Sequence, residues 1–570
     1  MYKNLPSQGF EGANHRGSEP IVSGWFVATL TSAFFLLEFV NILRHAMWRD
    51  EMQVWSFAIH SHSLRELHDL TRYEGHPEAW QILVYCVSRL SSNPVAMQFL
   101  HLAMATMTTF IVARYSPFPR LQKIMIVFGY FFFYEYAAIS RDYALGVLCL
   151  FSFCTVFRAG PRKSYGLLGV LLALMAASNV YALVLALSLA LMILFEALQA
   201  REPQQYLSAR PAGIACAAVL FPTALFVSLL HMHQPPDPGW SVSSSLAIRT
   251  HTGFSSTLAM IWRAFVPIPR LSHQFWNSNL LGDHIRVMAV LSILLFGISV
   301  LFFIHKRTVL LLYLCGVGAL LLLEKLVFTG YLRHDGHVFM LFLACMWLGK
   351  SLPEQRFPSG MLARVADRLR PYQDRLFLSL LAGQVIAALI ASVIAFKVPF
   401  SEAKAASDFL RARHMNDMFI IGDPDFAVSS IAGYLNREIY YPRGDRMGSF
   451  VIWDERRTRP TGLILDLAKK KAAERHQDVL VILNVREQLA QEIASFQGSI
   501  VESEDYYVYW VHAEKPETIS SPGLPPDDHI NNLFATSSFL RAVKRSWHCL
   551  CRISTPFLAQ VPTQADLSDR

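Results

Sequence analysis

Long apolar stretches recur along the first 400 residues of this chain and constrain its fold more than any other feature. A stretch of about 20 mostly apolar residues is long enough to cross a bilayer as an α-helix. The pattern predicts eleven spans, at residues 22–43, 94–114, 121–139, 142–157, 164–178, 181–199, 212–230, 285–304, 308–328, 335–349 and 376–397. Helices satisfy their own backbone hydrogen bonds in lipid, so the predicted fold is mainly α, a polytopic transmembrane bundle over residues 22–398.

The composition agrees with a membrane protein. Hydrophobic residues make up 53% of the chain and charged residues only 16%, with a mean hydropathy of +0.32. The net charge of +8 is more typical of basic residues retained in cytoplasmic loops than of a nucleic-acid-binding surface, and we expect no nucleic-acid partner. Six of the eight cysteines lie in or beside apolar segments, where they are interpreted as packing residues. Residues 1–20 lack a basic n-region followed by a cleavage site, so the span at 22–43 is predicted to remain as an anchor.

Basic residues predict which loops share a side of the membrane. Segment 77–90 is apolar but only 14 residues long, and it contains Arg89, so we interpret it as a helix lying at the interface. One set of loops then holds sixteen Lys and Arg in 57 residues, whereas the opposite set holds ten, all Arg. The first set comprises residues 114–123, 158–163, 200–211, 305–307 and 350–375. The positive-inside rule places this set, and residues 1–21, in the cytoplasm and the C-terminus outside.

A second domain is predicted after residue 398. Strand-like runs at 418–421 and 479–483 alternate with helical stretches at 401–414, 461–476 and 486–496. This alternation indicates a small extracytoplasmic α/β domain over residues 399–514. The Pro- and Ser-rich segment 515–570 is expected to be a disordered tail.

Two clusters of ionisable residues lie in the first predicted outer loop, where such residues at the membrane edge indicate function. Asp50 and Glu51 follow Arg49 just beyond the first span, and Glu74 and His76 come later. Adjacent helical side chains point about 100° apart, so one carboxylate could act as a base while the other binds locally or holds a cation. The alternative is a pair stabilised by the dipole of the following helix, and the Glu74–His76 spacing is too generic to specify a metal.

Two arginines begin later spans on the same predicted face. Arg141 lies in Ser140-Arg141-Asp142-Tyr143, and Arg333 precedes His334 in a short turn. A guanidinium at the mouth of two spans could bind an anion through paired N–H groups. The alternative is an ion pair of Arg141 with Asp142 or Glu135, which is about equally compatible with the sequence.

Taken together, these motifs resemble the GT-C superfamily of integral membrane glycosyltransferases, which includes the protein O-mannosyltransferases and the bacterial lipid A aminoarabinose transferases. Asp50-Glu51 is similar to the Asp-Glu pair of the first outer loop, Gly75-His76-Pro77 to a His-Pro-Pro-type motif, and Ser140-Arg141-Asp142-Tyr143 to a Ser-Arg or Arg-x-Tyr motif. The likeness covers roughly residues 20–200. Glu78 replaces the usual second Pro, and Gly146 stands where the mannosyltransferases have an Asp.

The resemblance implies a hexosyl- or pentosyltransferase that moves a sugar from a polyprenyl-phosphate donor to a cell-envelope glycan, lipid or protein. It implies inverting catalysis with Asp50 as the preferred base of the Asp50–Glu51 pair, and Arg141 and Arg333 as stabilisers of the lipid phosphate. The residues expected to bind substrate are Arg49, Glu74, His76, Arg141, Tyr143, Arg333 and His334. No cofactor is specified, although a divalent cation is compatible with the pattern. The expected location is a bacterial plasma membrane, with the site facing the periplasm or cell exterior.

Two other classes of protein fit parts of the sequence. A transporter or a lipid or oligosaccharide flippase could line its path with Arg141, Glu135 and Glu324, but such residues are then expected near mid-membrane on broken helices. A structural membrane protein would account for the α/β domain, but not for charged clusters repeated on one face.

Overall fold

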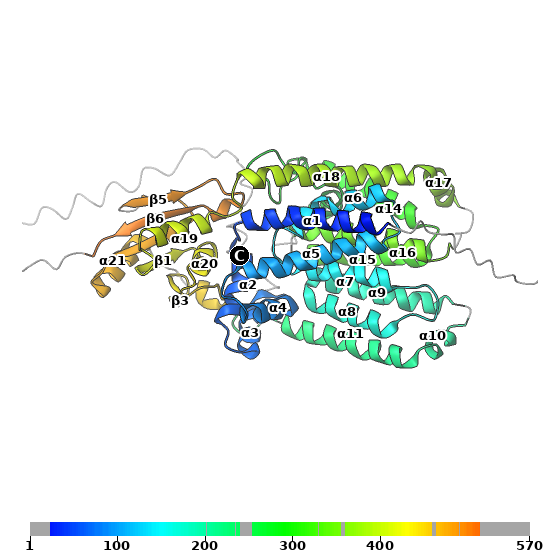
Figure 1. Cartoon of the computed structure of the whole chain (residues 1–570), viewed down its shortest axis with the longest axis horizontal. Helices are drawn as coiled ribbons and strands as arrows, with labels where there is room; N and C mark the ends of the chain where they lie inside the picture. Colours follow the sequence, from blue (N-terminus) through cyan, green and yellow to red (C-terminus); the bar gives the residue numbers. More distant parts are fainter. Residues whose placement is uncertain are drawn as a thin grey trace, which may run out of the picture.

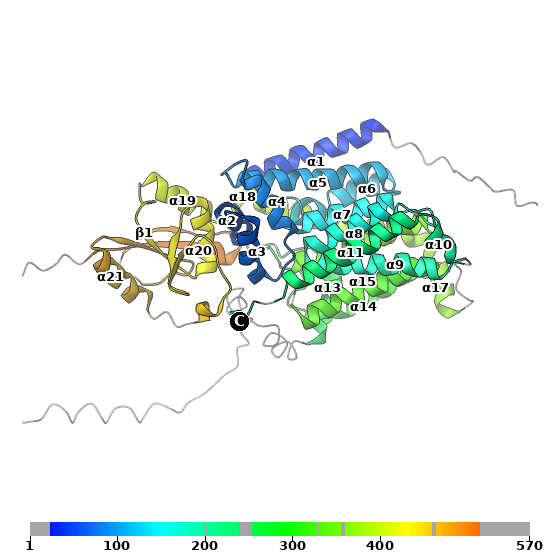
Figure 2. The same cartoon turned by 90° about the horizontal axis from the view of Figure 1, so that it is seen from below.

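The chain folds into a helical bundle and a smaller α/β domain, which lie side by side along the longest axis (Figures 1 and 2). This computed structural model describes residues 23–513 apart from residues 201, 234, 240–252, 329, 355–359, 459–462 and 489–490. The predicted fold class, mainly α with a small α/β domain, is confirmed. The predictions for residues 1–21 and for a tail over 515–570 lie outside the described residues.

Seven helical stretches in the described part of the chain are long and apolar enough to cross a membrane. They are α1 (Gly24–Arg44), α5 (Val95–Tyr115), α9 (Val180–Leu198), α11 (Pro211–His231), α14 (Ile285–Phe303), α15 (Arg307–Leu326) and the stretch Met361–Lys397, which contains α17 (Met361–Leu369) and α18 (Gln373–Lys397). Large apolar side chains remain exposed on them, such as Val219 on α11 at 63% and Val290 on α14 at 66%. Such extensive apolar surface suits lipid and not water, and the chain is an integral membrane protein.

The predicted count of eleven spans is not confirmed. Helices α7 (Tyr143–Val156) and α8 (Tyr165–Ser178) have 14 residues each, about 21 Å at the usual rise per residue. The predicted span 121–139 consists of α6 (Arg120–Val127) followed by a π-helical segment, η2 (Tyr130–Glu135). Helix α16 (Leu332–Ser351) is buried over nearly its whole length and begins with ionisable side chains, so its composition differs from that of a lipid-facing span.

Short helices cover the end of the bundle that faces the α/β domain (Figures 1 and 2). They are α2 (Arg49–His60), α3 (Leu64–Thr71), the 3-10 turn η1 (Arg72–Glu74) and α4 (Ala79–Ser88). Helix α4 corresponds to the predicted helix over 77–90. The segment between the predicted spans 212–230 and 285–304 contains α13 (Phe254–Phe265), which packs beside α14 and α16.

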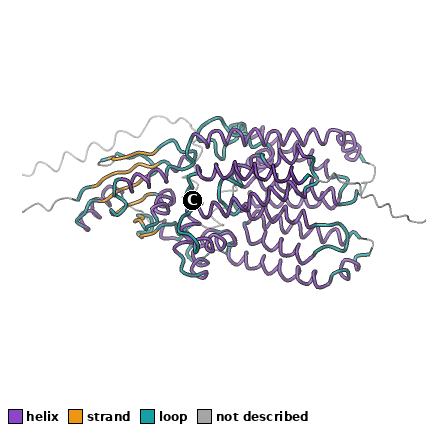
Figure 3. Tube along the Cα trace, viewed as in Figure 1, coloured by secondary structure: helices purple, strands orange, loops and turns teal. Residues whose placement is uncertain are grey.

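The α/β domain is built on a six-stranded mixed sheet of order β3-β2-β1-β4-β6-β5. Its strands are β1 (Phe419–Asp423), β2 (Ile439–Tyr441), β3 (Arg446–Gly448), β4 (Val479–Leu483), β5 (Glu492–Phe496) and β6 (Tyr506–Val511). Only β1 pairs in parallel, with β2 and β4, and the other pairs are antiparallel. In the part of the chain that is described, Figure 3 shows strands in this domain alone.

Helices cover both faces of the sheet, because successive side chains of a strand point to opposite faces and nearly all residues of β1 and β4 are buried. Ile420 and Leu480 face α19 (Ala403–Ala412) and α20 (Asp425–Leu435), whereas Ile421 and Val481 face α21 (Ile464–Arg475). The prediction of a helix over 486–496 is wrong, because residues 492–496 form β5. The Glu, Gln and Ala residues of this segment favour a helix, but pairing with β6 outweighs that preference.

The α/β domain holds α2 directly against the bundle. Gly433 of α20 lies against α2, where an added Cβ would come within 2.8 Å of Met52 Cε. Gln53 of α2 exchanges hydrogen bonds with the backbone of Val451, at 2.7 and 2.9 Å. Tyr434 of α20 accepts a hydrogen bond from the backbone N–H of Met47 at 2.7 Å. The residues that precede and form α2 are thereby fixed from two sides.

Candidate functional site

Glu51 fixes the first turn of α2. Its fully buried carboxylate accepts hydrogen bonds from the backbone N–H groups of Trp48 at 3.2 Å and Ser140 at 2.7 Å, and it lies 2.7 Å from His45 Nε2. An acceptor at the third position of a helix satisfies an N–H group that has no partner within the helix. Glu51 therefore joins the start of α2 to the loop that carries Arg141.

Asp50, the neighbouring carboxylate, faces a group of guanidiniums. Its Oδ2 atom lies 2.7 Å from Arg141 Nη1 and 3.8 Å from Arg333 Nη2, and its Oδ1 atom lies 3.8 Å from Arg49 Nε. Burial by itself raises the pKa of Asp50, but the positive charges of Arg141, Arg333 and Arg49 outweigh it and lower the pKa below its usual value. The side chain is 27% exposed, so the ionised carboxylate can be reached from outside.

Arg333 is held in an aromatic enclosure at the start of α16. Its guanidinium carbon lies 4.6 Å from the ring centre of Tyr331, 5.1 Å from that of Trp276 and 5.5 Å from that of Trp48. The side chain is only 8% exposed, and its Nε and Nη1 atoms have no hydrogen-bond partner among the described residues. Leaving buried charged donors unpaired costs free energy, so this guanidinium is suited to bind an anion.

Glu74 and His76 lie near enough to Asp50 for its charge to act on both. Gln53 Nε2 donates a hydrogen bond to Glu74 Oε1 at 3.0 Å, and burial raises the pKa of Glu74 to about 7. Burial lowers the pKa of His76, and this effect outweighs the carboxylate of Asp142, which raises it. At neutral pH His76 is therefore mostly uncharged and Glu74 is about half ionised, while the Asp142 carboxylate lies 3.9 Å from Arg141. The three guanidiniums thus face Asp50, Asp142 and a partly ionised Glu74.

Tyr143 and His334 contact the elements that carry the arginines. The Tyr143 ring centre is 5.8 Å from the Arg141 guanidinium carbon and 5.9 Å from the His334 ring centre. His334 Nδ1 accepts a hydrogen bond from the backbone N–H of Tyr331 at 2.9 Å, and its ring stacks on Tyr181 at 4.8 Å. These two residues support the loop and helix that carry Arg141 and Arg333, and neither forms a described contact with Asp50.

Two residues that the sequence interpretation missed complete the site. Glu504 of the α/β domain accepts a hydrogen bond from the backbone N–H of Arg49 at 3.2 Å and others from Ser401 at 2.8 Å and Tyr506 at 2.7 Å. Gln53 links Glu74 to the same domain. No motif marks Glu504, since it lies 455 residues from Arg49 and only the tertiary fold brings them together.

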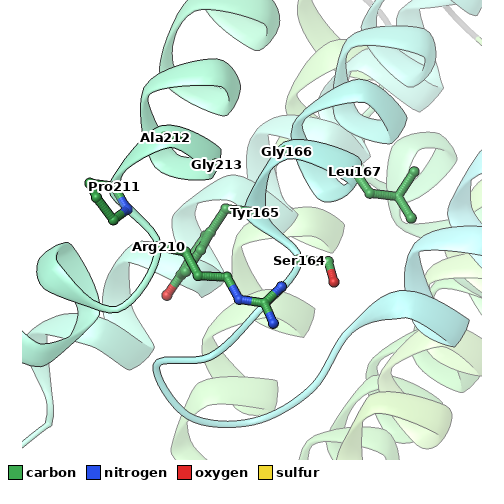
Figure 4. A pocket seen from close by; sticks show the side chains of 8 residues that line it. All are labelled: Ser164, Tyr165, Gly166, Leu167, Arg210, Pro211, Ala212 and Gly213. Carbon is green, nitrogen blue, oxygen red and sulfur yellow. The ribbon is translucent and has the colours of Figure 1, made fainter.

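A cavity of about 490 Å³ lies at the opposite end of the bundle (Figure 4). Its lining comes from the starts of α8 and α11, which include Tyr165, Gly166, Arg210 and Pro211. The other ends of these two helices reach the end of the bundle that carries α2, α3 and α4 (Figure 1). This cavity therefore contains none of the residues of the Asp50 site.

Comparisons with known proteins find several similar solved structures. No protein-family model and no curated protein sequence matches the chain. The structure of ArnT from Cupriavidus metallidurans bound to undecaprenyl phosphate aligns at 11% identity and a TM-score of 0.47, covering 86% of this chain and 98% of that one. The mycobacterial arabinofuranosyltransferase AftD aligns at 11% identity and a TM-score of 0.33, covering 86% of this chain and 42% of that one. Identities this low do not transfer an activity, so we derive the function from the site itself.

Proposed function

We propose that this chain is a membrane glycosyltransferase of the GT-C type, which transfers a sugar from a polyprenyl-phosphate donor to an acceptor hydroxyl. The observation that carries the proposal is an accessible, ionised Asp50 beside Arg333, whose buried Nε and Nη1 atoms have no partner among the described residues. A base next to an anion-binding guanidinium is the pair of groups that glycosyl transfer from a phosphate leaving group requires.

In the proposed reaction, Asp50 accepts the proton of the acceptor hydroxyl as that oxygen bonds to the anomeric carbon. The bond from this carbon to the phosphate oxygen breaks, and its electron pair stays on the polyprenyl phosphate. Arg333 and Arg141 stabilise the added charge through hydrogen bonds to the phosphate oxygens. Attack opposite the leaving group inverts the anomeric configuration. The sugar, hexose or pentose, and the acceptor, a glycan, lipid or protein of the cell envelope, are set by contacts beyond this pair.

Donor binding also supplies a way to activate Asp50. In the free protein the guanidiniums of Arg141 and Arg333 lower the pKa of Asp50, which makes it a weak base. A bound phosphate would attract the same guanidiniums and reduce their stabilisation of the carboxylate, so the pKa of Asp50 would rise. The base would then become stronger only when the donor is in place, which limits unproductive proton transfer.

The predicted sidedness puts the site on the outer face of a bacterial plasma membrane, and a lipid-linked donor suits that position. A polyprenyl-phosphate sugar diffuses within the outer leaflet and presents its phosphate at the level of the headgroups. A nucleotide sugar from the cytoplasm would have no access to that face. The sequence also lacks the glycine spacing of a dinucleotide-binding fingerprint after its strand-like runs.

The donor class can be tested with protein purified in detergent. Radiolabelled polyprenyl-phosphate sugars and the corresponding nucleotide sugars are supplied in separate reactions with a membrane extract as the source of acceptor. We expect labelled product only from the lipid-linked donor, with inverted anomeric configuration by NMR. Transfer from a nucleotide sugar without a lipid carrier would contradict the donor assignment. Movement of intact lipid-linked sugar across vesicles without product would favour a flippase.

A further inference from the structure

Three side chains of kinds that can bind a metal converge at the end of the bundle that carries α2, outside the contacts of Asp50, Arg141 and Arg333. His68 lies in α3, Glu78 precedes α4, and His231 is the last residue of α11. His68 Nδ1 lies 3.0 Å from Glu78 Oε2, His231 Nδ1 lies 3.1 Å from His68 Nδ1, and His231 Nδ1 lies 3.6 Å from Glu78 Oε2. The two histidines are 163 residues apart in the chain, so the fold alone brings them together.

Hydrogen bonds among the three side chains cannot pair all of their facing nitrogen and oxygen atoms. The Thr71 hydroxyl donates to the carbonyl of Leu67 at 2.9 Å, so its oxygen is left to accept a hydrogen bond from His231 Nε2 at 3.3 Å. A proton on Nε2 leaves the Nδ1 lone pair of neutral His231 directed at His68 and Glu78. A single proton on His68 Nδ1 can form a good hydrogen bond to either Glu78 or His231, but not to both at once. A cation between them would accept a lone pair from all three.

The distances fit such a cation. Four ligands at the corners of a tetrahedron, each about 2.05 Å from a zinc ion, lie about 3.3 Å from one another. The three observed separations of 3.0, 3.1 and 3.6 Å bracket that value. Two imidazoles with one carboxylate favour zinc and its neighbours over calcium or magnesium, which prefer oxygen ligands. We propose that His68, Glu78 and His231 bind one divalent ion of the zinc class.

The surroundings of the cluster suit a bound ion. The His231 side chain is 1% exposed and is held by Thr71, whereas Glu78 is 20% and His68 43% exposed. A hydrogen bond to the second nitrogen of a metal-binding histidine fixes the tautomer that leaves the first nitrogen free. The exposed side gives an ion access from solvent and leaves room for water as a fourth ligand.

The ion would fasten three elements to one another. Its ligands come from α3, the start of α4 and the end of α11, and the connection between α3 and α4 carries Glu74 and His76. Just after α11, Asp237 accepts a hydrogen bond from Tyr73 of the same connection at 2.8 Å. The three ligands are therefore positioning residues for the segment 72–77. The metal site stands whether or not the chain transfers sugars.

The test uses the tag-free full-length protein in detergent. The protein is stripped with a chelator, equilibrated with zinc chloride and analysed by inductively coupled plasma mass spectrometry and by thermal unfolding. We expect about one zinc per chain and a higher Tm with zinc than with chelator. His68→Ala and Glu78→Gln should each lower zinc affinity at least about tenfold and remove the response of Tm. Cobalt in place of zinc should give the visible absorption of a tetrahedral site in the wild type only.

His273→Ala serves as the matched control, because His273 is an exposed histidine between α13 and α14 and lies outside the cluster. It should bind zinc like the wild type. The His231 side chain is buried, so the test relies on the more exposed His68 and Glu78, whose replacements disturb folding least. Folded wild-type protein that binds no zinc would overturn the proposal. Zinc binding that persists undiminished in both variants, or that is lost equally in His273→Ala, would overturn it as well.

Discussion

The two ends of the bundle differ in a way that locates the chemistry. The end next to the α/β domain contains Asp50 with three guanidiniums near it. Arg333 at this end is 8% exposed, and two of its nitrogens have no hydrogen-bond partner among the described residues. The opposite end has a cavity of about 490 Å³, but it is lined mainly by Gly, Pro, Ala and Leu, and its Arg210 is exposed to solvent. Cavity volume and concentrated charge therefore point to different places.

Buried charge locates the functional site of this chain better than cavity volume does. Burying an unpaired ionised group costs free energy, and such groups are concentrated at functional sites. The exposed Arg210 keeps its hydration, so its charge costs little folding free energy. Arg333 has lost most of its hydration, and two of its nitrogens gain no hydrogen bond from the described residues in return. An incoming anion would recover that loss, whereas nothing comparable would be gained at the other end.

Replacing the base should give the largest effect. We expect Asp50→Asn to lower kcat about 1,000-fold or more, because it keeps the size of the side chain but removes its capacity to accept a proton. The measurement is transfer from a polyprenyl-phosphate sugar by purified protein, with size-exclusion chromatography to confirm folding. Activity near the wild-type level in folded Asp50→Asn would remove Asp50 as the base and break the contrast between the two ends.

Replacing the anion-binding guanidinium should give the next largest effect. Arg333→Lys keeps the positive charge but loses the planar set of donors, so we expect kcat/KM for the donor to fall about 10- to 100-fold. Arg270→Lys is the matched control. Arg270 is 45% exposed, lies between α13 and α14, and pairs with Asp283 from the same segment. Equal kinetics in Arg333→Lys and the wild type would show that the unpaired nitrogens do not bind the donor.

Glu51→Gln should lower the stability of the protein more than its catalytic rate. One of the backbone N–H groups of Trp48 and Ser140 would face the amide –NH2 group of Gln instead of an oxygen, at a cost of about 1–3 kcal/mol in stability. We expect a lower Tm and a smaller loss of kcat than in Asp50→Asn. Glu66→Gln is the control, since Glu66 accepts from the backbone of His62 near the start of α3 in a more exposed setting. A loss of kcat as large as that of Asp50→Asn, with an unchanged Tm, would favour Glu51 as the base.

Much of the bundle could be predicted because long apolar stretches leave few alternatives. Asp50, Arg141 and Arg333 were expected on one face from loop charges alone, and the structure places a carboxylate oxygen of Asp50 2.7 Å from Arg141 and 3.8 Å from Arg333. Counting spans was less successful, because the aromatic run 130–135 is apolar like a span but forms a buried π-helical segment. Hydropathy does not distinguish a side chain facing lipid from one facing the bundle interior.

Contacts between distant segments account for the rest. Glu504 fixes Arg49 from the α/β domain, and its position depends on how that domain docks onto α2. His68, Glu78 and His231 show the same limit, since their spacing in the sequence has no metal-binding pattern. Strand β5 was mistaken for a helix because its pairing with β6 is not visible in local propensity. In each case the deciding partner is far away in the chain.

The smallest effect is expected at the cavity, and it completes the comparison. Tyr165→Phe and Arg210→Gln each change a polar group that lines it. Neither residue contacts the Asp50 group, Arg210 is exposed, and the buried hydroxyl of Tyr165 has no hydrogen-bond partner among the described residues. We therefore expect kcat and KM to stay within about twofold of the wild type. The measurement is the transfer assay used for Asp50→Asn, run in parallel with Tm. A rise in donor KM or a drop in kcat of tenfold or more in Arg210→Gln, with Tm unchanged, would mean that the cavity takes part in the reaction. The two ends would then be coupled, and buried charge would no longer suffice to locate the function.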